Sequence, residues 1–383
     1  MNAIILAGGL GTRLRSVVNE VPKCMAPVAG KPFLYYLLKY VSRKDIDKVI
    51  LSVGYLREII FTWIDSVKDQ FPFEIDYAIE ETPLGTGGGI RLALSKCSSD
   101  DVLVLNGDTM FDVPLDSFIE QHKNNPSAAV SLALKPMKNF DRYGTVSTDT
   151  NGVITSFNEK QPCAQGNING GVYIIRRSNL DLSQLPEKFS FEKDVFEPHV
   201  SLHDLYGYAF DPFFIDIGIP EDYLRSQYEF LIRYSDYKTL LLDRDGTINK
   251  LRPNDYVKSW DEFEFLPLFL SFAKSIGERF ERIFIVTNQR GVGKGLMTEE
   301  DLKDIHDRMC DELYKGYGLM IDEIFYCAAL DKSDLRRKPQ TGMWEDIIKK
   351  YPSVVASSTI MVGDGDGDQQ FAENAGISFA RVW

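Results

Sequence analysis

Short apolar segments alternate with longer amphipathic segments twice along this chain, first up to about Ala128 and again from Tyr237. In the first stretch we expect strands at Asn2–Leu6, Lys48–Val53, Glu74–Ile79 and Val102–Leu105, and helices at Pro32–Val41, Leu56–Lys68, Gly88–Ser95 and Leu115–Lys123. In the second we expect strands at Lys238–Leu242, Arg282–Thr287, Glu323–Cys327, Thr359–Val362 and Ser378–Arg381, and helices at Leu266–Gly277, Thr298–Tyr317, Gly342–Lys350 and Asp368–Ala375. Parallel sheets covered by helices on both faces have this pattern, because their strands are buried on both sides. The pattern predicts an α/β chain that folds as two domains.

The middle of the chain has a different pattern, one of strands and turns. Asn151-Gly152 is a hairpin signal, and further strands are expected at Gly171–Ile175 and Asp204–Phe210 before a helix at Pro220–Tyr234. We place the boundary at residues 233–236, which predicts domains of residues 1–235 and 236–383. A length of 383 residues with 44% hydrophobic residues is enough for two buried cores.

The composition restricts the partners and the compartment. A formal net charge of -13 argues against binding to nucleic acid or to an anionic membrane, because both attract basic surfaces. Nucleotides and sugar phosphates remain possible ligands, since they need only a local cluster of donors. The five cysteines are scattered without a CxxC pair, and the chain has neither a signal-peptide pattern nor a bilayer-length apolar stretch. We therefore expect a cytoplasmic protein, and the sequence leaves its oligomeric state open.

A glycine-rich loop follows the first expected strand directly. Gly8, Gly9 and Gly11 allow backbone N–H groups to approach phosphate oxygens, and Arg13 can contact the same phosphates. Such a loop alone favours an ordinary connection between a strand and a helix, with surface lysines beyond it. Its meaning depends on the motifs that come after it.

Those motifs, in order, resemble the sugar-1-phosphate nucleotidyltransferase family over about residues 1–235. They are Gly8-Gly9-Leu10-Gly11-Thr12-Arg13-Leu14, Val21-Pro22-Lys23-Cys24-Met25-Ala26-Pro27-Val28, Lys31-Pro32-Phe33, Leu84-Gly85-Thr86-Gly87-Gly88, Asn106-Gly107-Asp108, Tyr143-Gly144, Glu159-Lys160, Asn169-Gly170-Gly171-Val172-Tyr173 and Phe214-Ile215-Asp216-Ile217-Gly218. The resemblance implies a Rossmann-like domain with a mixed sheet of the GT-A-like kind. In such enzymes a sugar 1-phosphate attacks the α-phosphorus of a nucleoside triphosphate, and pyrophosphate leaves.

The resemblance also implies roles for single residues. The expected nucleotide-binding residues are Leu6, Ala7, Gly8, Gly9, Gly11, Thr12, Arg13, Lys23, Gly85, Thr86 and Asp108, and Arg13 and Lys23 are expected to be catalytic. The expected sugar-binding residues are Gly144, Glu159, Lys160, Asn169 and Gly170. Asp108 and Asp216 are expected to hold Mg²⁺. Other interpretations stay open, since Asp108 could cap a turn and Lys160 could be a solvated surface charge.

The second half carries a different set of reactive residues. Asp243-Arg244-Asp245-Gly246-Thr247 follows an apolar strand, and Thr287 ends the next one. Arg337-Lys338-Pro339 adds a lysine, and Val362-Gly363-Asp364-Gly365-Asp366-Gly367-Asp368 adds three acids after a later strand. These residue types suit phosphoryl transfer through an aspartyl phosphate. An acidic surface loop is the alternative, but four elements in order, each beside an apolar strand, favour the phosphatase interpretation.

Residues 237–383 resemble the haloacid-dehalogenase-like phosphatases, most of all the branch that acts on heptose bisphosphate and histidinol phosphate. The resemblance implies a Rossmann-like domain without a large cap, in which Asp243 attacks phosphorus and Asp245 is the general acid and base. It implies phosphate contacts from Thr287, Asn288 and Lys338 and Mg²⁺ ligands from Asp243, Asp245 (through its backbone carbonyl) and Asp364. That branch often carries a Cys/His zinc loop, but only Cys327 occurs at this place, so we predict no structural zinc.

Together the two resemblances predict a bifunctional enzyme of nucleotide-activated heptose synthesis. It would remove the 7-phosphate of D-glycero-D-manno-heptose 1,7-bisphosphate and join heptose 1-phosphate to GMP from GTP. Two alternatives stay open. The transferase could use mannose 1-phosphate or another sugar 1-phosphate with GTP, UTP or CTP, beside a phosphatase of different specificity, or the second domain could be a non-catalytic assembly module.

Overall fold

The computed structural model describes residues 1–8 and 21–382 of the chain. The contacts divide it into two compact units, one of Met1–Ala26 with Pro32–Asp222 and one of Pro27–Lys31 with Tyr223–Trp383. Glycines and turn residues interrupt the pattern at many points, yet almost every expected helix and strand is present with ends within a few residues of the prediction. The boundary predicted at residue 235 stays a prediction, since helix α6 contributes to the second unit from Tyr223 onward.

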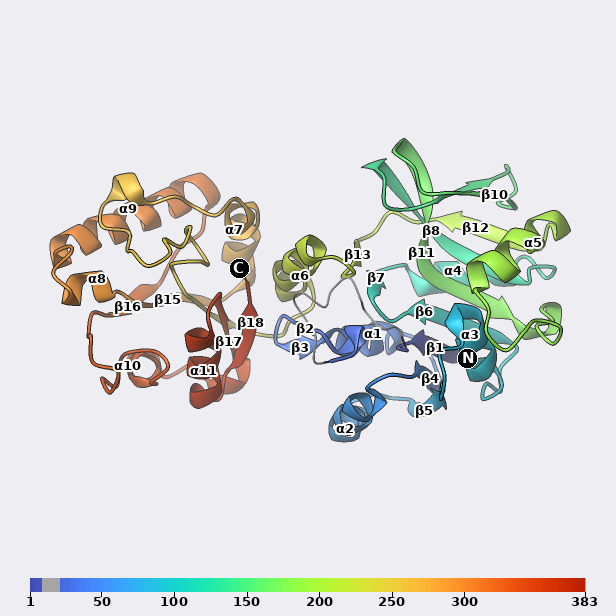
Figure 1. Ribbon diagram of the computed structural model, residues 1–383, viewed down its shortest axis with the longest axis horizontal. Coiled ribbons are helices and arrows are strands. Elements are labelled where there is room, and N and C mark those ends of the chain that lie inside the picture. The colour runs from blue at the N-terminus through green and yellow to red at the C-terminus, as the bar shows by residue number, and fades with distance from the viewer. Residues whose placement is uncertain (9–20, 383) are drawn as a thin grey trace. The chain divides into compact units, whose positions relative to one another are not determined.

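Most of the described α-helices and strands are labelled in Figure 1. The helices are α1 (Phe33–Val41), α2 (Arg57–Val67), α3 (Gly85–Leu94), α4 (Leu115–Lys123), α5 (Glu197–His199), α6 (Pro220–Arg233), α7 (Pro267–Arg279), α8 (Arg290–Gly293), α9 (Glu299–Tyr317), α10 (Gly342–Lys350) and α11 (Asp366–Ala375). The strands are β1 (Asn2–Leu6), β2 (Pro27–Val28), β3 (Lys31–Pro32), β4 (Lys48–Val53), β5 (Glu74–Ile79), β6 (Asp101–Asn106), β7 (Thr109–Phe111), β8 (Val130–Phe140), β9 (Thr145–Thr148), β10 (Ile154–Asn158), β11 (Cys163–Arg176), β12 (Leu205–Ala209), β13 (Phe214–Asp216), β14 (Thr239–Leu242), β15 (Arg282–Asn288), β16 (Glu323–Cys327), β17 (Thr359–Gly363) and β18 (Ser378–Arg381).

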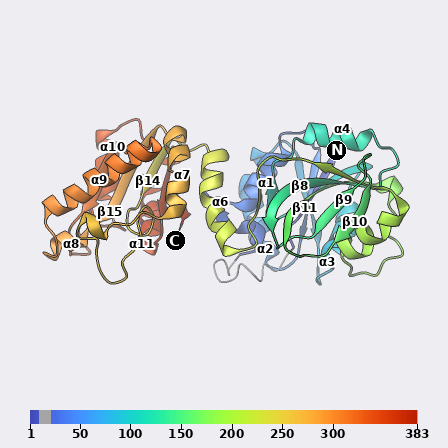
Figure 2. The ribbon, with the colours of Figure 1, turned by 90° about the horizontal axis from the view of Figure 1, so that it is seen from above.

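The N-terminal unit is built on a mixed sheet, as predicted. Its strand order is β10-β9-β11-β6-β1-β4-β5, with β8 paired to β11 and β12. Strand β1 lies between the parallel strands β4 and β6, and its Ile4 and Ile5 are fully buried on opposite faces. Helices α3 and α4 lie on opposite sides of this sheet (Figure 2). The apolar run Asn2–Leu6 therefore forms a central strand that is buried on both faces of the sheet.

The antiparallel part of this sheet was only partly predicted. Strand β11 pairs antiparallel with both β6 and β8, and β9 and β10 form the hairpin signalled by Asn151-Gly152, where Gly152 has a φ of 83°. The strand expected at Gly171–Ile175 is the C-terminal half of a fourteen-residue strand. Its first half is polar and glycine-rich, so the sequence pattern does not reveal it.

The C-terminal unit is a five-stranded, fully parallel sheet in the order β16-β15-β14-β17-β18. Helices α7 and α9 cover one face, and α10 and α11 cover the other (Figure 1). The described residues 238–382 contain no inserted cap domain between these elements. The chain passes from β14 to β15 and then β16 on one side of the sheet, and it returns to the other side of β14 with β17 and β18. The strand order therefore reverses at β14, and such sheets bind ligands at the carboxyl ends of the strands at this point.

Two further observations concern the whole described chain. None of its helices has both the length and the apolar composition needed to cross a bilayer. All five cysteines are free thiols. Cys327, the single cysteine at the place where related phosphatases often carry a zinc loop, is a buried side chain. The expected cytoplasmic location stays a prediction.

The core of the C-terminal sheet supplies a stability prediction. Phe284 on β15 is fully buried, with its ring centroid 6.0 Å from that of Phe325 and 4.9 Å from that of Tyr351. We expect Phe284→Ala to lower the free energy of unfolding of this unit by about 3–5 kcal/mol, because the ring leaves a cavity that the sheet cannot close. Urea unfolding followed by circular dichroism measures this. Met320→Ala is the control, since Met320 is 64% exposed and its loss should cost about 0.5 kcal/mol or less; equal losses would contradict the packing argument.

Candidate active sites

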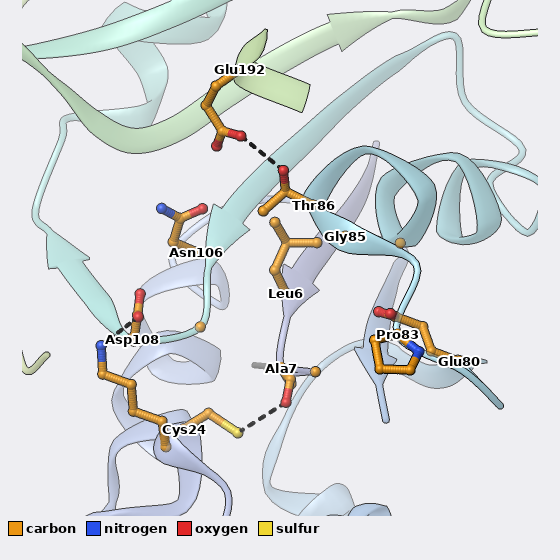
Figure 3. Close-up of a pocket in the computed structure, with 14 residues that line it drawn as sticks. Leu6, Ala7, Cys24, Glu80, Pro83, Gly85, Thr86, Asn106, Asp108 and Glu192 are labelled. Carbon is orange, nitrogen blue, oxygen red and sulfur yellow. Dashed lines mark hydrogen bonds and ion pairs between the residues drawn. The ribbon is translucent and has the colours of Figure 1, made fainter. Parts of the chain in front are cut away.

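The first candidate site is a cavity at the carboxyl ends of β1 and β6. It has a volume of about 370 Å³. Its lining residues are Leu6, Ala7, Gly8, Lys23, Cys24, Glu80, Pro83, Gly85, Thr86, Gly89, Asn106, Gly107, Asp108 and Glu192. Figure 3 shows Glu80 and Pro83 on one side of the end of β1 and Asp108 on the other. The cavity therefore has a carboxylate on each side of the end of β1, that of Glu80 and that of Asp108.

One lysine joins the two predicted metal ligands in this unit. Lys23 Nζ lies 2.5 Å from Asp108 Oδ2 and 3.3 Å from Asp216 Oδ1. Strands β7 and β13 cause the convergence, because they pair with Asp216 opposite Thr109 and so bring Asp216 beside Asp108. Burial and the nearby Asp108 charge raise the pKa of Asp216, although Lys23 opposes the shift. Two carboxylates that share one cation in this way can also hold a divalent metal ion.

Glu80, which the sequence analysis did not single out, occupies the other side of the cavity. Its Oε1 accepts a hydrogen bond from Ser52 Oγ at 2.9 Å, and its Oε2 accepts one from the backbone N–H of Leu84 at 3.1 Å. Each carboxylate oxygen has a second lone pair, so both oxygens can accept another hydrogen bond from a ligand. Its position directly after β5 was visible in the sequence, but no motif drew attention to it.

The loop before α3 is held closely against the chain that carries Glu192. Gly85 has a φ of 73°, and a Cβ at that position would lie 2.5 Å from the carbonyl oxygen of Phe189. Thr86 Oγ1 donates to Glu192 Oε2 at 2.8 Å and accepts from the backbone N–H of Phe191 at 2.9 Å. This explains why glycine and then threonine are needed in the predicted Leu84-Gly85-Thr86 motif. It also adds Glu192 to the site, as a carboxylate that sequence reasoning missed.

The structure gathers some of the predicted residues and not others. Leu6, Ala7, Gly8, Lys23, Gly85, Thr86 and Asp108 line the one cavity, whereas Gly9, Gly11, Thr12 and Arg13 lie outside the described residues. The five predicted sugar-binding residues, Gly144, Glu159, Lys160, Asn169 and Gly170, are not part of its lining. Glu159 and Lys160 are exposed after β10, while Asn169 is tied to Tyr173 Oη at 3.0 Å. The roles given to these residues stay predictions.

The second candidate site lies where β14, β15 and β17 end. The carboxylates of Asp243, Asp364 and Asp368 lie within 4.8 Å of one another. Lys338 Nζ donates to Asp243 at 2.6 Å, to Asp368 at 2.5 Å and to the carbonyl oxygen of Val286 at 2.7 Å. Asp368 was visible in the sequence as the last acid of a run but received no role. The structure adds it to the site as a direct partner of the lysine.

Burial changes the protonation equilibria of these groups. Burial raises the pKa of Asp243, although the Lys338 ammonium opposes it, and burial with the nearby Asp368 charge raises the pKa of Asp364 to about 6. The pKa of Lys338 is itself raised, since attraction to Asp243 and Asp368 outweighs the effect of its burial. Three carboxylates around one ammonium leave a net negative charge in a buried place, which suits a divalent cation.

A glycine allows the loop after β14 to reach this cluster. Gly246 has a φ of 94°, and a Cβ there would lie 2.1 Å from Asp364 Oδ2. Any side chain at this position would displace the Asp364 carboxylate. The glycine in the Asp243-Arg244-Asp245-Gly246-Thr247 run is therefore needed for close approach as well as for the turn.

The remaining predicted residues of this site hold one another in place. Gln289 Nε2 donates to Thr287 Oγ1 and to Asp245 Oδ2, both at 2.9 Å. The Asn288 side chain makes two hydrogen bonds to the backbone of Lys338, at 3.0 and 3.1 Å. Asp245 is also bound by Arg244 Nη2 at 2.9 Å. Burial would raise the pKa of Asp245, but the Arg244 guanidinium and these hydrogen bonds lower it.

Three arginines line the cavity of the second site beside its aspartates. Its cavity, about 300 Å³, is lined by Arg252, Arg290 and Arg337 in addition to Asp243 and Lys338. The Nε of Arg290 is buried and has no hydrogen-bond partner among the described residues. An arginine in the lining of a phosphate-handling pocket can bind a second anionic group.

A histidine behind this site supplies a pH prediction. Burial and the Arg244 guanidinium lower the pKa of His306 to about 3, from an ordinary value of about 6.5 in the unfolded chain. Below pH 6.5 the unfolded state binds a proton that the folded state does not. The free energy of unfolding therefore decreases as the pH is lowered, and at pH 5 this group alone lowers it by about 2 kcal/mol relative to neutral pH. His306→Gln should therefore lose less stability than the natural chain between pH 7.5 and pH 5. Urea unfolding at both pH values measures this, and identical losses for the two proteins would contradict it.

Each half of the chain matches a known family model. Residues 2–231 match the Nucleotidyl transferase family model, and residues 238–381 match the Polynucleotide kinase 3 phosphatase family model. The chain is 49% identical over 229 residues to D-glycero-alpha-D-manno-heptose 1-phosphate guanylyltransferase of Aneurinibacillus thermoaerophilus, which covers 60% of this chain and 98% of the relative. It is 46% identical over 233 residues to the protein of the same name from Campylobacter jejuni subsp. jejuni serotype O:2, covering 61% and 99%.

A solved structure agrees with this placement. The crystal structure of HddC from Yersinia pseudotuberculosis complexed with GMP-PN is 35% identical, covers 60% of this chain and 99% of its own, and has a TM-score of 0.51. The expected α/β folds and the expectation of two enzyme classes, a nucleotidyltransferase and a haloacid-dehalogenase-like phosphatase, are confirmed. The chain belongs to the nucleotidyl transferase family and carries a phosphatase domain C-terminal to its nucleotidyltransferase domain.

Proposed function

We propose that this chain performs two steps in the synthesis of a nucleotide-activated heptose. The phosphatase domain hydrolyses the 7-phosphate of D-glycero-D-manno-heptose 1,7-bisphosphate, and the transferase domain joins heptose 1-phosphate to GMP from GTP, releasing pyrophosphate. The observation that carries the proposal is the 49% identity to a heptose 1-phosphate guanylyltransferase over 98% of that relative's length. The phosphatase domain on the same chain supplies the reaction that makes its substrate.

In the transferase site, the residues present position groups and neutralise charge. The sugar phosphate oxygen attacks the α-phosphorus of the nucleotide, and the bond to pyrophosphate breaks. Lys23 stabilises the charge that develops on the reacting phosphate, and Arg13 is proposed to contact the leaving pyrophosphate. Mg²⁺ held by Asp108 and Asp216 would neutralise phosphate oxygens. The convergence of both aspartates on Lys23 Nζ supports this assignment.

The choice of guanine is supported by Glu80. The pairing edge of guanine presents two adjacent donors, N1–H and N2–H, which match the two oxygens of a carboxylate. Adenine has an acceptor at N1, and uracil presents a single N–H, so neither satisfies both oxygens. Glu80 is oriented in advance by Ser52 and by the Leu84 N–H, which leaves its remaining lone pairs for a base.

In the phosphatase site, Asp243 attacks phosphorus and the bond to the sugar oxygen breaks. Asp245 gives the leaving oxygen a proton and then takes one from the water that hydrolyses the aspartyl phosphate. Lys338 and Thr287 contact the phosphoryl oxygens, and Mg²⁺ held by Asp243, the Asp245 carbonyl and Asp364 would reduce the repulsion between the nucleophile and the phosphate. The cluster of Asp243, Asp364 and Asp368 around the lysine supports this part.

A bisphosphate substrate is supported by the arginines in the cavity lining. While one phosphate reacts at Asp243, the other remains at the far end of the sugar and needs a binding partner. Arg252, Arg290 and Arg337 line the same cavity, and Arg252 is already paired with Asp255 and Glu262. The buried Nε of Arg290 has no hydrogen-bond partner in the described part of the chain, so it is an available donor. A monophosphate would leave this donor unused.

The central experiment measures both products of the full chain with Mg²⁺. We expect heptose 1,7-bisphosphate to release phosphate, and heptose 1-phosphate with GTP to release pyrophosphate. Asp243→Ala should lower phosphate release more than about 1,000-fold, because the covalent route is lost, while pyrophosphate release stays within about twofold. If mannose 1-phosphate, or UTP or CTP, gives pyrophosphate and the heptose with GTP does not, the heptose assignment is wrong.

Glu80 supplies a prediction about the base. We expect Glu80→Gln to lower kcat/KM for GTP about 10- to 100-fold, because one of the two accepting oxygens becomes a donor that faces a guanine N–H. The GTP-to-UTP ratio should fall by a similar factor. Glu81→Gln is the matched control, since Glu81 is exposed and pairs with Arg57 at 3.1 Å. An unchanged GTP-to-UTP ratio in the Glu80 variant would exclude Glu80 from base selection.

A further inference from the structure

We propose that Arg244 and His306 form a buried support that orients the Asp245 carboxylate for proton transfer to the leaving oxygen. The inference rests on the proposed phosphatase activity and deepens it. It assigns a positioning role to two residues that have no place in the predicted catalytic set. Neither residue is among those that line the phosphatase cavity, so each would act through Asp245.

Arg244 is the largest fully buried side chain of the described molecule. It lies between Asp243 and Asp245 in the chain, and because side chains alternate at the end of a strand, it points away from the cavity that they line. A buried guanidinium without a partner is costly, so its partner identifies its role. That partner is Asp245, which accepts from Nη2 at 2.9 Å on both oxygens.

The other contacts of Asp245 make it a carboxylate with a single orientation. Asn249 Nδ2 donates to Oδ1 and Gln289 Nε2 donates to Oδ2, each at 2.9 Å. The side chain of Asp245 nevertheless remains 24% exposed, and it lines the cavity beside Asp243. Hydrogen-bond donors therefore fix both oxygens of the Asp245 carboxylate, while its exposed part remains accessible to the substrate.

His306 extends this support to a separate element. It lies on α9, and its Nε2 is 3.1 Å from Arg244 Nη1. An arginine N–H can only donate, so Nε2 must be the unprotonated acceptor. The histidine is 7% exposed, and its ring centroid lies 6.0 Å from that of Tyr326 on β16. Helix α9 thus fixes the Arg244 guanidinium through His306, and the guanidinium fixes the Asp245 carboxylate.

The consequence for catalysis concerns geometry. A general acid must stand within hydrogen-bond reach of the oxygen that leaves, and its effect disappears when its orientation is lost. Of the described residues that bind Asp245, Arg244 alone contacts both of its oxygens. Releasing Arg244 Nη1 from His306 would let the guanidinium, and the carboxylate with it, turn away from the leaving oxygen.

The test uses leaving groups that differ in their need for a proton. Nitrophenolate leaves without protonation, whereas phenolate and sugar alkoxides depend on an acid. We would measure phenol and nitrophenol release in the first turnover of the full chain with Mg²⁺, so that later hydrolysis does not limit the rate. His306→Leu should lose about tenfold on phenyl phosphate and less than twofold on nitrophenyl phosphate. His306→Gln, which keeps an accepting oxygen, should restore the phenyl phosphate rate.

The outcomes separate the inference from the function on which it rests. Equal losses on both esters, or no loss on either, would overturn the positioning role. If the natural chain cleaves neither ester nor heptose bisphosphate, the proposed phosphatase fails instead. If His306→Leu does not fold by circular dichroism, Arg244→Lys replaces it, because lysine keeps the charge but not the paired donors, and the same selective loss is expected.

Discussion

Each candidate site of this chain is organised around one lysine ammonium that lies between two aspartates. Lys23 joins Asp108 and Asp216 in the first unit, and Lys338 joins Asp243 and Asp368 in the second. Carboxylates that share a cation are held near each other despite their repulsion, and the resulting geometry is one that a divalent metal ion can use. Three of these aspartates lie in a strand or within two residues of its end, namely Asp108, Asp216 and Asp243. Asp368 lies instead in the first turn of helix α11, which follows β17.

The two units reach the same arrangement through different topology. In the first, Asp108 follows β6 while Asp216 arrives on β13, which runs antiparallel to β7. In the second, the parallel strands β14 and β17 end side by side and place Asp243 and Asp364 near each other. The lysine of each site comes from a connecting segment outside these strands, so neither site depends on a continuous motif. This is why only several motifs in order, and no single loop, were informative at the sequence level.

The sequence predicted the parallel parts of the fold well, because buried strands are continuous apolar runs between amphipathic helices. It predicted the first half of β11 poorly, where Gly166 and Asn167 give no apolar alternation. Among the site residues, Asp243 and Lys338 were found through motifs. Glu80 was missed, since a carboxylate after a strand is ordinary until the fold places it in a cavity. Arg244 and His306 are 62 positions apart, so their hydrogen bond is a product of tertiary packing that no local pattern contains.

The burial of the two lysines differs, and this distinguishes the two reactions. The side chains of Lys338, Asp243 and Asp368 are 4, 10 and 7% exposed, whereas those of Lys23, Asp108 and Asp216 are 14, 36 and 28% exposed. Charges interact more strongly where water is excluded, so the phosphatase cluster is the more rigid of the two. A covalent nucleophile, the role proposed for Asp243, benefits from such rigidity, because it must meet phosphorus in one orientation. The transferase only positions two substrates and neutralises their charge, and a more hydrated pair of aspartates can admit a large triphosphate and release pyrophosphate without breaking a buried ion pair.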